Sequence, residues 1–152
     1  MRIWVLLSVC LLSGITVKAT TQDELLDVIR LVESTGGKNL EGDYLKSYPY
    51  DKGFRAIGPY QMWRCYVDDV NMVLRDKLHS KVRYTYNDRW DETKSREMVR
   101  IYLWYWSRQA GTDKVEDVCL IHHFGPKGYK HKDRSYWTRK ICPALKVVQE
   151  RR

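Results

Sequence analysis

Apolar side chains recur at helical spacing through most of the chain beyond residue 20, and this periodicity limits the fold more than any other feature. Between Asp23 and Glu33, leucine, isoleucine and valine return every three or four residues, and the stretch 34–37 then ends the run. We expect further helices from about Pro59 or Gln61 to Leu78, at Glu92–Gln109, at Asp113–Phe124 and at Asp133–Gln149, with Pro143 kinking or splitting the last. The sequence therefore predicts a mainly helical protein.

A non-helical insert interrupts this pattern between the first two expected helices. Residues 39–58 are rich in glycine, tyrosine, aspartate and lysine and lack helical periodicity. Such a stretch is typical of an irregular loop with a small hairpin at most. Since no repeat or linker divides the remainder, we expect a single domain over residues 20–152.

The N-terminal stretch has the layout of a secretory signal peptide. A basic start at Arg2 precedes the apolar run 3–12, and Val17-Lys18-Ala19 resembles a small-residue cleavage site. We expect residues 1–19 to be removed and the protein to be secreted. The apolar run is too short for a permanent transmembrane helix, and no longer run follows, so we expect no stable membrane insertion.

The remaining chain is basic. Without Arg2 and Lys18, 25 lysine and arginine residues face 19 acidic ones, which leaves a net charge of +6. A basic secreted protein attracts anionic cell walls, membrane surfaces or nucleic acids, and net charge does not choose among these partners.

Cysteine usage indicates that the core, and not a disulfide framework, holds the fold. Once Cys10 leaves with the signal peptide, Cys65, Cys119 and Cys142 remain, which permits one intramolecular bridge at most. We expect Cys142 to pair with Cys119, because both lie on helices at the C-terminal side. A bridge between Cys65 and Cys142 is the alternative.

Glu33 is the most informative candidate for catalysis. Leu26, Ile29 and Glu33 stand three and four residues apart, so the carboxylate continues an apolar stripe of its helix. Partial desolvation there disfavours the charged form and raises the pKa of the carboxyl, as a general acid working near neutral pH requires. The simpler alternative is a helix-end glutamate that bonds nearby backbone or Arg30.

Three short motifs resemble those of the lysozyme and lytic-transglycosylase superfamily, in that family's order. Glu33-Ser34 followed by Gly36-Gly37 resembles the Glu-Ser-x-Gly segment of goose-type lysozymes and lytic transglycosylases. The stretch 58–61, Gly-Pro-Tyr-Gln, is similar to the Gly-Pro-Tyr-Gln-Ile element of invertebrate-type lysozymes. The stretch 122–129 looks like the Asn-Gly-Gly-Pro-x-Gly-Tyr element, except that His123 stands where the family usually has asparagine.

This resemblance implies an α+β lysozyme-like fold, in which the small hairpin or loop insert forms one wall of a cleft. It implies a muramidase that cleaves the β-1,4 bond between N-acetylmuramic acid and N-acetylglucosamine in bacterial peptidoglycan, with Glu33 as general acid. The substrate-binding residues that it implies are Ser34, Tyr60, Gln61, His123, Tyr129 and Tyr136. An antimicrobial, monomeric protein that needs no cofactor and binds no nucleic acid is expected on the same grounds.

A second carboxylate separates the two activities of this superfamily. Hydrolysis generally uses a pair of carboxyl groups. Asp51, seven residues before Gly58, matches the second acid of similar invertebrate-type lysozymes, with Asp43 and Glu41 as rivals. Without such an acid the protein would be a lytic transglycosylase that forms an anhydro sugar. Asp51 also suits a plain turn, in which its side chain caps the backbone.

Other chemistries have less support. His122 and His123 are adjacent, so on a helix they point in different directions and cannot grip one metal ion together, and we expect no metal site. Cys119 is expected to be a half-cystine and not a nucleophile. The departure at His123 favours one further alternative, a non-catalytic lysozyme-like protein that binds sugar or acts as a cationic antimicrobial.

Overall fold

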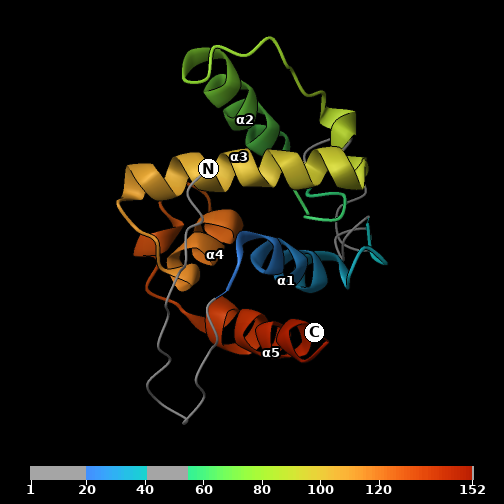
Figure 1. Cartoon of the computed structure of the whole chain (residues 1–152), viewed down its shortest axis with the longest axis vertical. Helices are drawn as coiled ribbons and strands as arrows, with labels where there is room; N and C mark the ends of the chain where they lie inside the picture. Colours follow the sequence, from blue (N-terminus) through green and yellow to red (C-terminus); the bar gives the residue numbers. More distant parts are fainter. Residues whose placement is uncertain (1–19, 41–54, 152) are drawn as a thin grey trace. The chain divides into compact units, whose positions relative to one another are not determined.

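The computed structural model describes residues 20–40 and 55–151 of the chain. The expected signal peptide lies outside the described residues, as do Asp51, Asp43 and Glu41. The predicted loop insert is described only at its ends, residues 39–40 and 55–58. Figure 1 shows the order of the elements along the chain.

The described residues are mainly helical, which confirms the predicted class. The α-helices are α1 (Gln22–Ser34), α2 (Arg64–Asp76), α3 (Glu92–Ala110), α4 (Val115–Phe124) and α5 (Cys142–Glu150). Three shorter helical elements are η2 (Tyr86–Trp90), η3 (Gly128–Lys130) and the π-helix η4 (Trp137–Ile141). No strand of a sheet occurs within the described ranges, and an antiparallel bridge joins Ile57 to Met62.

Helix α2 begins later than the sequence predicts. Residues 58–62 form a turn instead of a first helical turn, because Gln61 adopts a positive φ of 46°. Ile57 and Met62 then exchange two backbone hydrogen bonds of 3.2 and 3.0 Å. A residue with positive φ cannot continue a right-handed helix, so α2 begins only at Arg64.

The last predicted helix is divided where Pro143 suggested. The wide turn of η4 precedes α5, and the backbone N–H of Cys142 donates to the carbonyl of Trp137. Pro143 follows as the second residue of α5, and the backbone keeps right-handed helical angles through Ile141 and Cys142. A π-turn therefore precedes the proline, with no break in the helical backbone.

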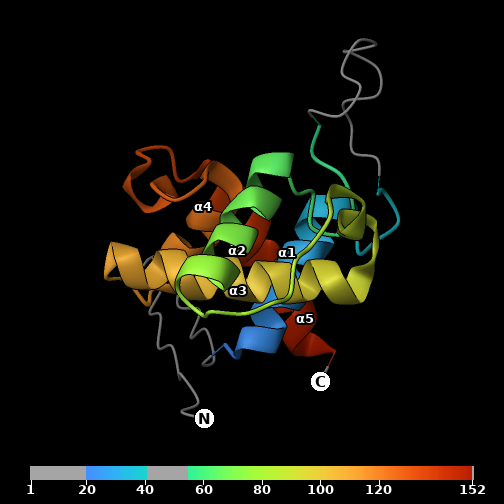
Figure 2. The same cartoon turned by 90° about the horizontal axis from the view of Figure 1, so that it is seen from above.

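Two compact units make up the described chain. The central unit, residues 29–40 and 55–105, contains the end of α1, α2, η2 and most of α3. Within it, α2 crosses α3 (Figures 1 and 2), and Tyr66 of α2 stacks on Tyr102 of α3 with ring centroids 3.7 Å apart. Its core side chains include Ile29, Tyr60, Met62, Val67, Val70, Met98 and Val99.

The terminal unit comprises residues 20–28 and 106–151. Here η3 and η4 pack against α4, and α5 contacts η4. Gly128 of η3 lies so close to α4 that a Cβ atom would collide with the carbonyl oxygen of Leu120. Its buried side chains include Leu26, Val118, Leu120, Ile121, Ile141 and Leu145.

Among the described residues, no helix is both long enough and apolar enough to cross a membrane.

Candidate functional site

The end of α1 presents Glu33 and Ser34 at a sharp change of chain direction. The helix stops because Thr35, the first residue after it, takes a positive φ of 53°, and Gly36 and Gly37 follow with 72° and 87°. The backbone N–H groups of Lys38 and Asn39 both donate to the carbonyl of Ser34, at 2.9 Å each. Glu33 is half-buried at this corner, whereas Ser34 is buried.

Ser34 connects the first two motifs. Its Oγ lies 2.7 Å from the carbonyl oxygen of Pro59 and 3.1 Å from that of Arg30. A serine hydroxyl has one proton, and the shorter contact identifies Pro59 as the main acceptor. The same oxygen accepts a 2.8 Å hydrogen bond from the backbone N–H of Gly37. The Glu-Ser and Gly-Pro-Tyr-Gln elements, 25 residues apart, are thus adjacent.

Gly58 is required at this turn for two independent reasons. Its φ of 83° disfavours other residues, and a Cβ atom there would collide with the carbonyl oxygen of Arg89. Arg89 is itself buried, and its guanidinium donates to the carbonyls of Arg55, Met62 and Tyr86 at 3.1, 2.8 and 2.8 Å. Burial lowers the pKa of Arg89, and nearby Arg64 lowers it further.

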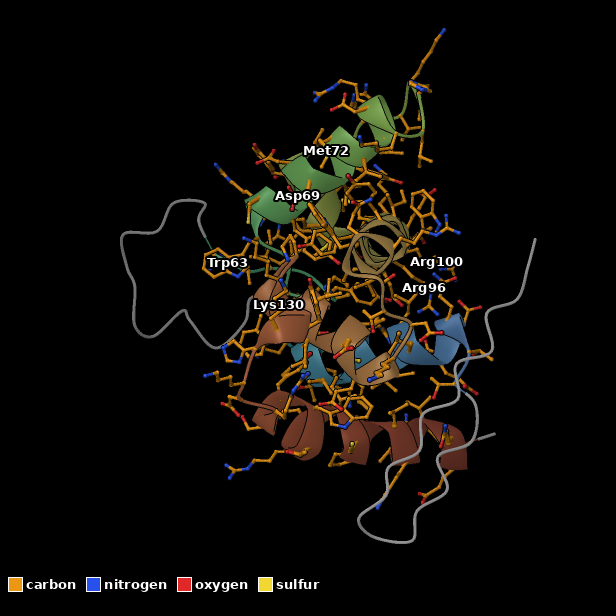
Figure 3. All side chains as sticks on the ribbon, turned by 90° about the vertical axis from the view of Figure 1, so that its left-hand side faces the viewer. Trp63, Asp69, Met72, Arg96, Arg100 and Lys130 are labelled. Atoms are coloured by element: carbon orange, nitrogen blue, oxygen red, sulfur yellow. The ribbon has the colours of Figure 1, made fainter. Side chains whose placement is uncertain are left out.

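Tyr60 and Gln61 have different surroundings within the same motif. Tyr60 is fully buried, and its hydroxyl accepts a 3.1 Å hydrogen bond from Nη1 of Arg96. Arg96 lies on α3 and is labelled in Figure 3. Gln61 is half-buried, and its Nε2 faces the carbonyls of Asn39, Leu40 and Gly58 at 3.3, 3.2 and 2.9 Å. Gln61 therefore holds Asn39 and Leu40, the first residues of the loop insert, beside Gly58.

These positions change what two of the predicted substrate-binding residues contribute. The side chains of Ser34 and Tyr60 present almost no surface to solvent, so in this structure they support the corner beside Glu33 from inside. The amide of Gln61 offers its oxygen for hydrogen bonding, because its nitrogen is the atom that faces the carbonyls. Gln61 is the member of this motif that retains surface for a ligand.

Glu33 interacts electrostatically with Tyr66, a buried tyrosine of α2. Burial raises the pKa of Tyr66 well above its usual value, and Tyr102, Glu33 and Asp69 raise it further. Asp69, labelled on α2 in Figure 3, has a raised pKa because it is partly buried and because Asp68 is next to it. Glu33 and Asp69 thus both act on one phenol.

No sequence pattern predicts that Glu33, Tyr66 and Asp69 interact. The spacing of Tyr66, Val70 and Val73 does place Tyr66 on the inner face of α2, and all three are buried. Nothing in the sequence connects that face to Glu33. Nothing in the sequence indicates that Arg89 is buried either, since arginine in a polar stretch is normally exposed.

The third motif lies in the terminal unit. His123 is exposed at the end of α4 and stacks on Tyr136, with centroids 3.9 Å apart and planes 11° from parallel. Phe124 stacks in the same way on His131, at 4.0 Å and 5°. Tyr129 is half-buried, with Nζ of Lys130 5.4 Å from its ring centroid. The structure therefore gathers His123 and Tyr136, two of the predicted substrate-binding residues, into one array of rings.

The predicted site residues are thus divided between the two units. Glu33, Ser34, Tyr60 and Gln61 belong to the central unit, and the terminal unit holds the other described ones, His123, Tyr129 and Tyr136. Asp51 lies outside the described residues.

The described part of the chain holds no cluster of three or more histidine, cysteine or acidic residues arranged to bind a metal ion. It also contains no disulfide: Cys65 is exposed, Cys119 is buried and Cys142 is half-buried. The bridge between Cys119 and Cys142 stays a prediction.

No model of a known protein family, no curated protein and no solved structure matches the chain.

Proposed function

We propose that this chain is a secreted muramidase of lysozyme-like fold, which cleaves the β-1,4 bond between N-acetylmuramic acid and N-acetylglucosamine in peptidoglycan. The observation that carries the proposal is the 2.7 Å hydrogen bond from Ser34 to Pro59. It joins two short motifs that resemble one superfamily, and it does so directly beside Glu33. The contact therefore brings the two motifs together at the residue that follows the candidate acid.

The surroundings of Glu33 suit a general acid. Its carboxyl is half-buried, and it acts on the buried phenol of Tyr66, which packs against a second phenol, Tyr102. Partial burial of a carboxyl disfavours its ionised form, and this favours a proton that stays available near neutral pH. In the proposed reaction Glu33 delivers this proton to the glycosidic oxygen as the bond to the leaving sugar breaks.

Asp51 takes the part of the second carboxylate in this proposal. It either activates a water molecule or supports the positive charge that develops on the sugar ring. Gln61 binds sugar amide and hydroxyl groups in the same unit as Glu33, since its half-buried side chain offers polar atoms at the surface. The secreted form begins after residue 19 and acts as a monomer.

Mass spectrometry of the products from purified peptidoglycan tests the proposal. A hydrolase releases fragments with an ordinary reducing end, and Asp51→Asn then lowers the rate by orders of magnitude. Anhydro products together with a fully active Asp51→Asn variant would instead establish a lytic transglycosylase. An absence of fragments at any enzyme concentration would overturn the proposal in favour of a non-catalytic binding protein.

A further inference from the structure

The net positive charge beyond residue 19 is concentrated in one segment. Residues 118–149 contain seven lysine and arginine residues and one acidic residue, whereas the other positions from residue 20 onward carry 18 of each sign. The basic residues of the segment are Lys127, Lys130, Lys132, Arg134, Arg139, Lys140 and Lys146. All but Arg134 are exposed. The rest of the chain is therefore electrically balanced, and this segment is not.

Arg134 is the exception because acidic residues of α4 neutralise it. Its Nη1 lies 3.3 Å from a carboxylate oxygen of Asp117 and 3.4 Å from one of Glu116. Its Nη2 donates to the carbonyl of Tyr129 at 3.2 Å. This arginine fixes the loop after η3 to α4, whereas the other six basic residues of the segment are exposed.

The ring array holds the same loop in place. The stack of Phe124 on His131 attaches the loop to the end of α4, and the stack of His123 on Tyr136 attaches the residues just before η4. The charged side chains therefore project from a packed backbone, which reduces the entropy lost when a ligand binds.

We infer that the exposed cations of residues 127–146 form a binding surface for a polymer of phosphodiester-linked units, of which poly(glycerol phosphate) is the simplest. Regularly spaced phosphates on a flexible chain can neutralise several lysines at once, with release of counterions. The choice of this polymer rests on the proposed function, because such a wall polymer would retain the enzyme beside its substrate. The inference that this surface binds a polyanion rests only on its charge and packing.

Two other partners suit this surface less well. Nucleic acids without sequence preference stack their bases on open aromatic faces, but here Phe124 and Tyr136 each already have a histidine ring stacked on one face. Membrane docking needs a large apolar face. Among the described residues of this segment, Phe124 and Val147 are the large apolar side chains that are exposed.

Calorimetric titration of the purified protein with poly(glycerol phosphate), at about 50 to 200 mM salt, tests the inference. Six lysine and arginine contacts predict a slope of log K against log salt of about −4, by analogy with single-stranded polyanions. The variant Lys132→Gln/Lys140→Gln/Lys146→Gln should reduce this slope to about −2 and weaken binding at least tenfold at about 100 mM salt. A matched control, Lys77→Gln/Lys81→Gln/Arg83→Gln, removes the same charge from exposed positions of the central unit.

The control variant should retain the affinity of the wild type to within about threefold. Equal losses in the two triple variants would overturn the inference, because net charge alone would then explain binding. Tighter binding to duplex DNA, or no binding to the polymer at about 50 mM salt, would overturn it as well. Cleavage of peptidoglycan freed of such polymers is measured separately: its absence in the wild type defeats the proposed function but leaves the surface intact.

Discussion

Ser34 donates a 2.7 Å hydrogen bond to the carbonyl oxygen of Pro59, and both groups are buried. This contact fixes the end of α1 against the turn that precedes α2. Because Glu33 is the adjacent residue, the position of the proposed catalytic carboxyl depends on a bond that its neighbour makes.

Ser34→Ala should destabilise the protein by about 1–3 kcal/mol, because the buried carbonyl of Pro59 and the N–H of Gly37 each lose a partner. Urea unfolding followed by circular dichroism measures the change. Ser80→Ala is the control, since the Oγ of Ser80 accepts an exposed hydrogen bond from Val82, and its cost should stay within about 0.5 kcal/mol. Equal costs in the two variants would refute the connecting role of Ser34.

Gly58→Ala should destabilise the fold more than Gly111→Ala does. Both glycines have positive φ, 83° and 66°, so alanine is strained at either position by about 1–2 kcal/mol. Only at Gly58 does the new methyl group collide with backbone, whereas Gly111 has open space around it. Thermal unfolding of both variants separates strain from collision. A cost at Gly58 no larger than that at Gly111 would show that the close approach to Arg89 is unimportant.

Asp69→Asn should stabilise the protein at neutral pH. The folded-state pKa of Asp69 lies above 3.8, so the folded protein holds this proton more tightly than the unfolded chain does. Between 3.8 and the folded value, stability therefore falls as pH rises, and the full loss is present at pH 7. The variant removes this loss, and its advantage should shrink as the pH is lowered through the same window.

Asp76→Asn is the control for this pH dependence. The hydrogen bond from Arg75 lowers the pKa of Asp76, so any pH effect at this exposed residue has the opposite sign. The measurement is the unfolding midpoint of the wild type and of both variants between about pH 3 and pH 7. An Asp69→Asn protein that is less stable than wild type at pH 7 would contradict the assigned cause.

Tyr66→Phe should move the pH profile of activity. A neutral phenol beside a carboxylate turns its hydrogen toward the ionised form and stabilises it, so removal of the hydroxyl raises the pKa of Glu33. Activity that depends on the protonated acid then extends to higher pH. The measurement is kcat/KM on soluble peptidoglycan fragments across the pH range.

Tyr102→Phe provides the matched comparison. It shares the stack with Tyr66 and is equally buried, but burial, Asp69 and Cys65 are what raise its pKa. Its pH profile should remain that of the wild type. Identical shifts in the two variants, or none in either, would remove Tyr66 from the surroundings that tune Glu33.

Most helices could be predicted because the spacing of their apolar residues and the residues that begin or end them indicate the same bounds. Helix α3 begins at Glu92 as expected, and α4 ends at Phe124, where Gly125 supplies a positive φ of 86°. The start of α2 could not be predicted. Its displacement depends on a positive φ at Gln61, a residue whose type gives no indication of that conformation.

The motifs identified the corner around Glu33 but not its internal arrangement. Serine and tyrosine next to a candidate acid suggest contact with a ligand, yet burial assigns Ser34 and Tyr60 to the supporting structure. That outcome depends on hydrogen bonds between positions 25 and 36 residues apart, to Pro59 and from Arg96. The local sequence does not indicate which distant residues form such hydrogen bonds.

The rate at which purified peptidoglycan releases soluble fragments, compared between wild type and Glu33→Gln at equal folded concentration, tests the central claim most directly. Glutamine has almost the same shape but cannot deliver a proton, so the rate should fall about 10²- to 10⁴-fold while the unfolding midpoint is unchanged. Glu92→Gln, at an exposed glutamate of the same unit, should keep the wild-type rate. A Glu33→Gln protein that retains more than about half of the wild-type rate would contradict the assignment of Glu33 as the general acid.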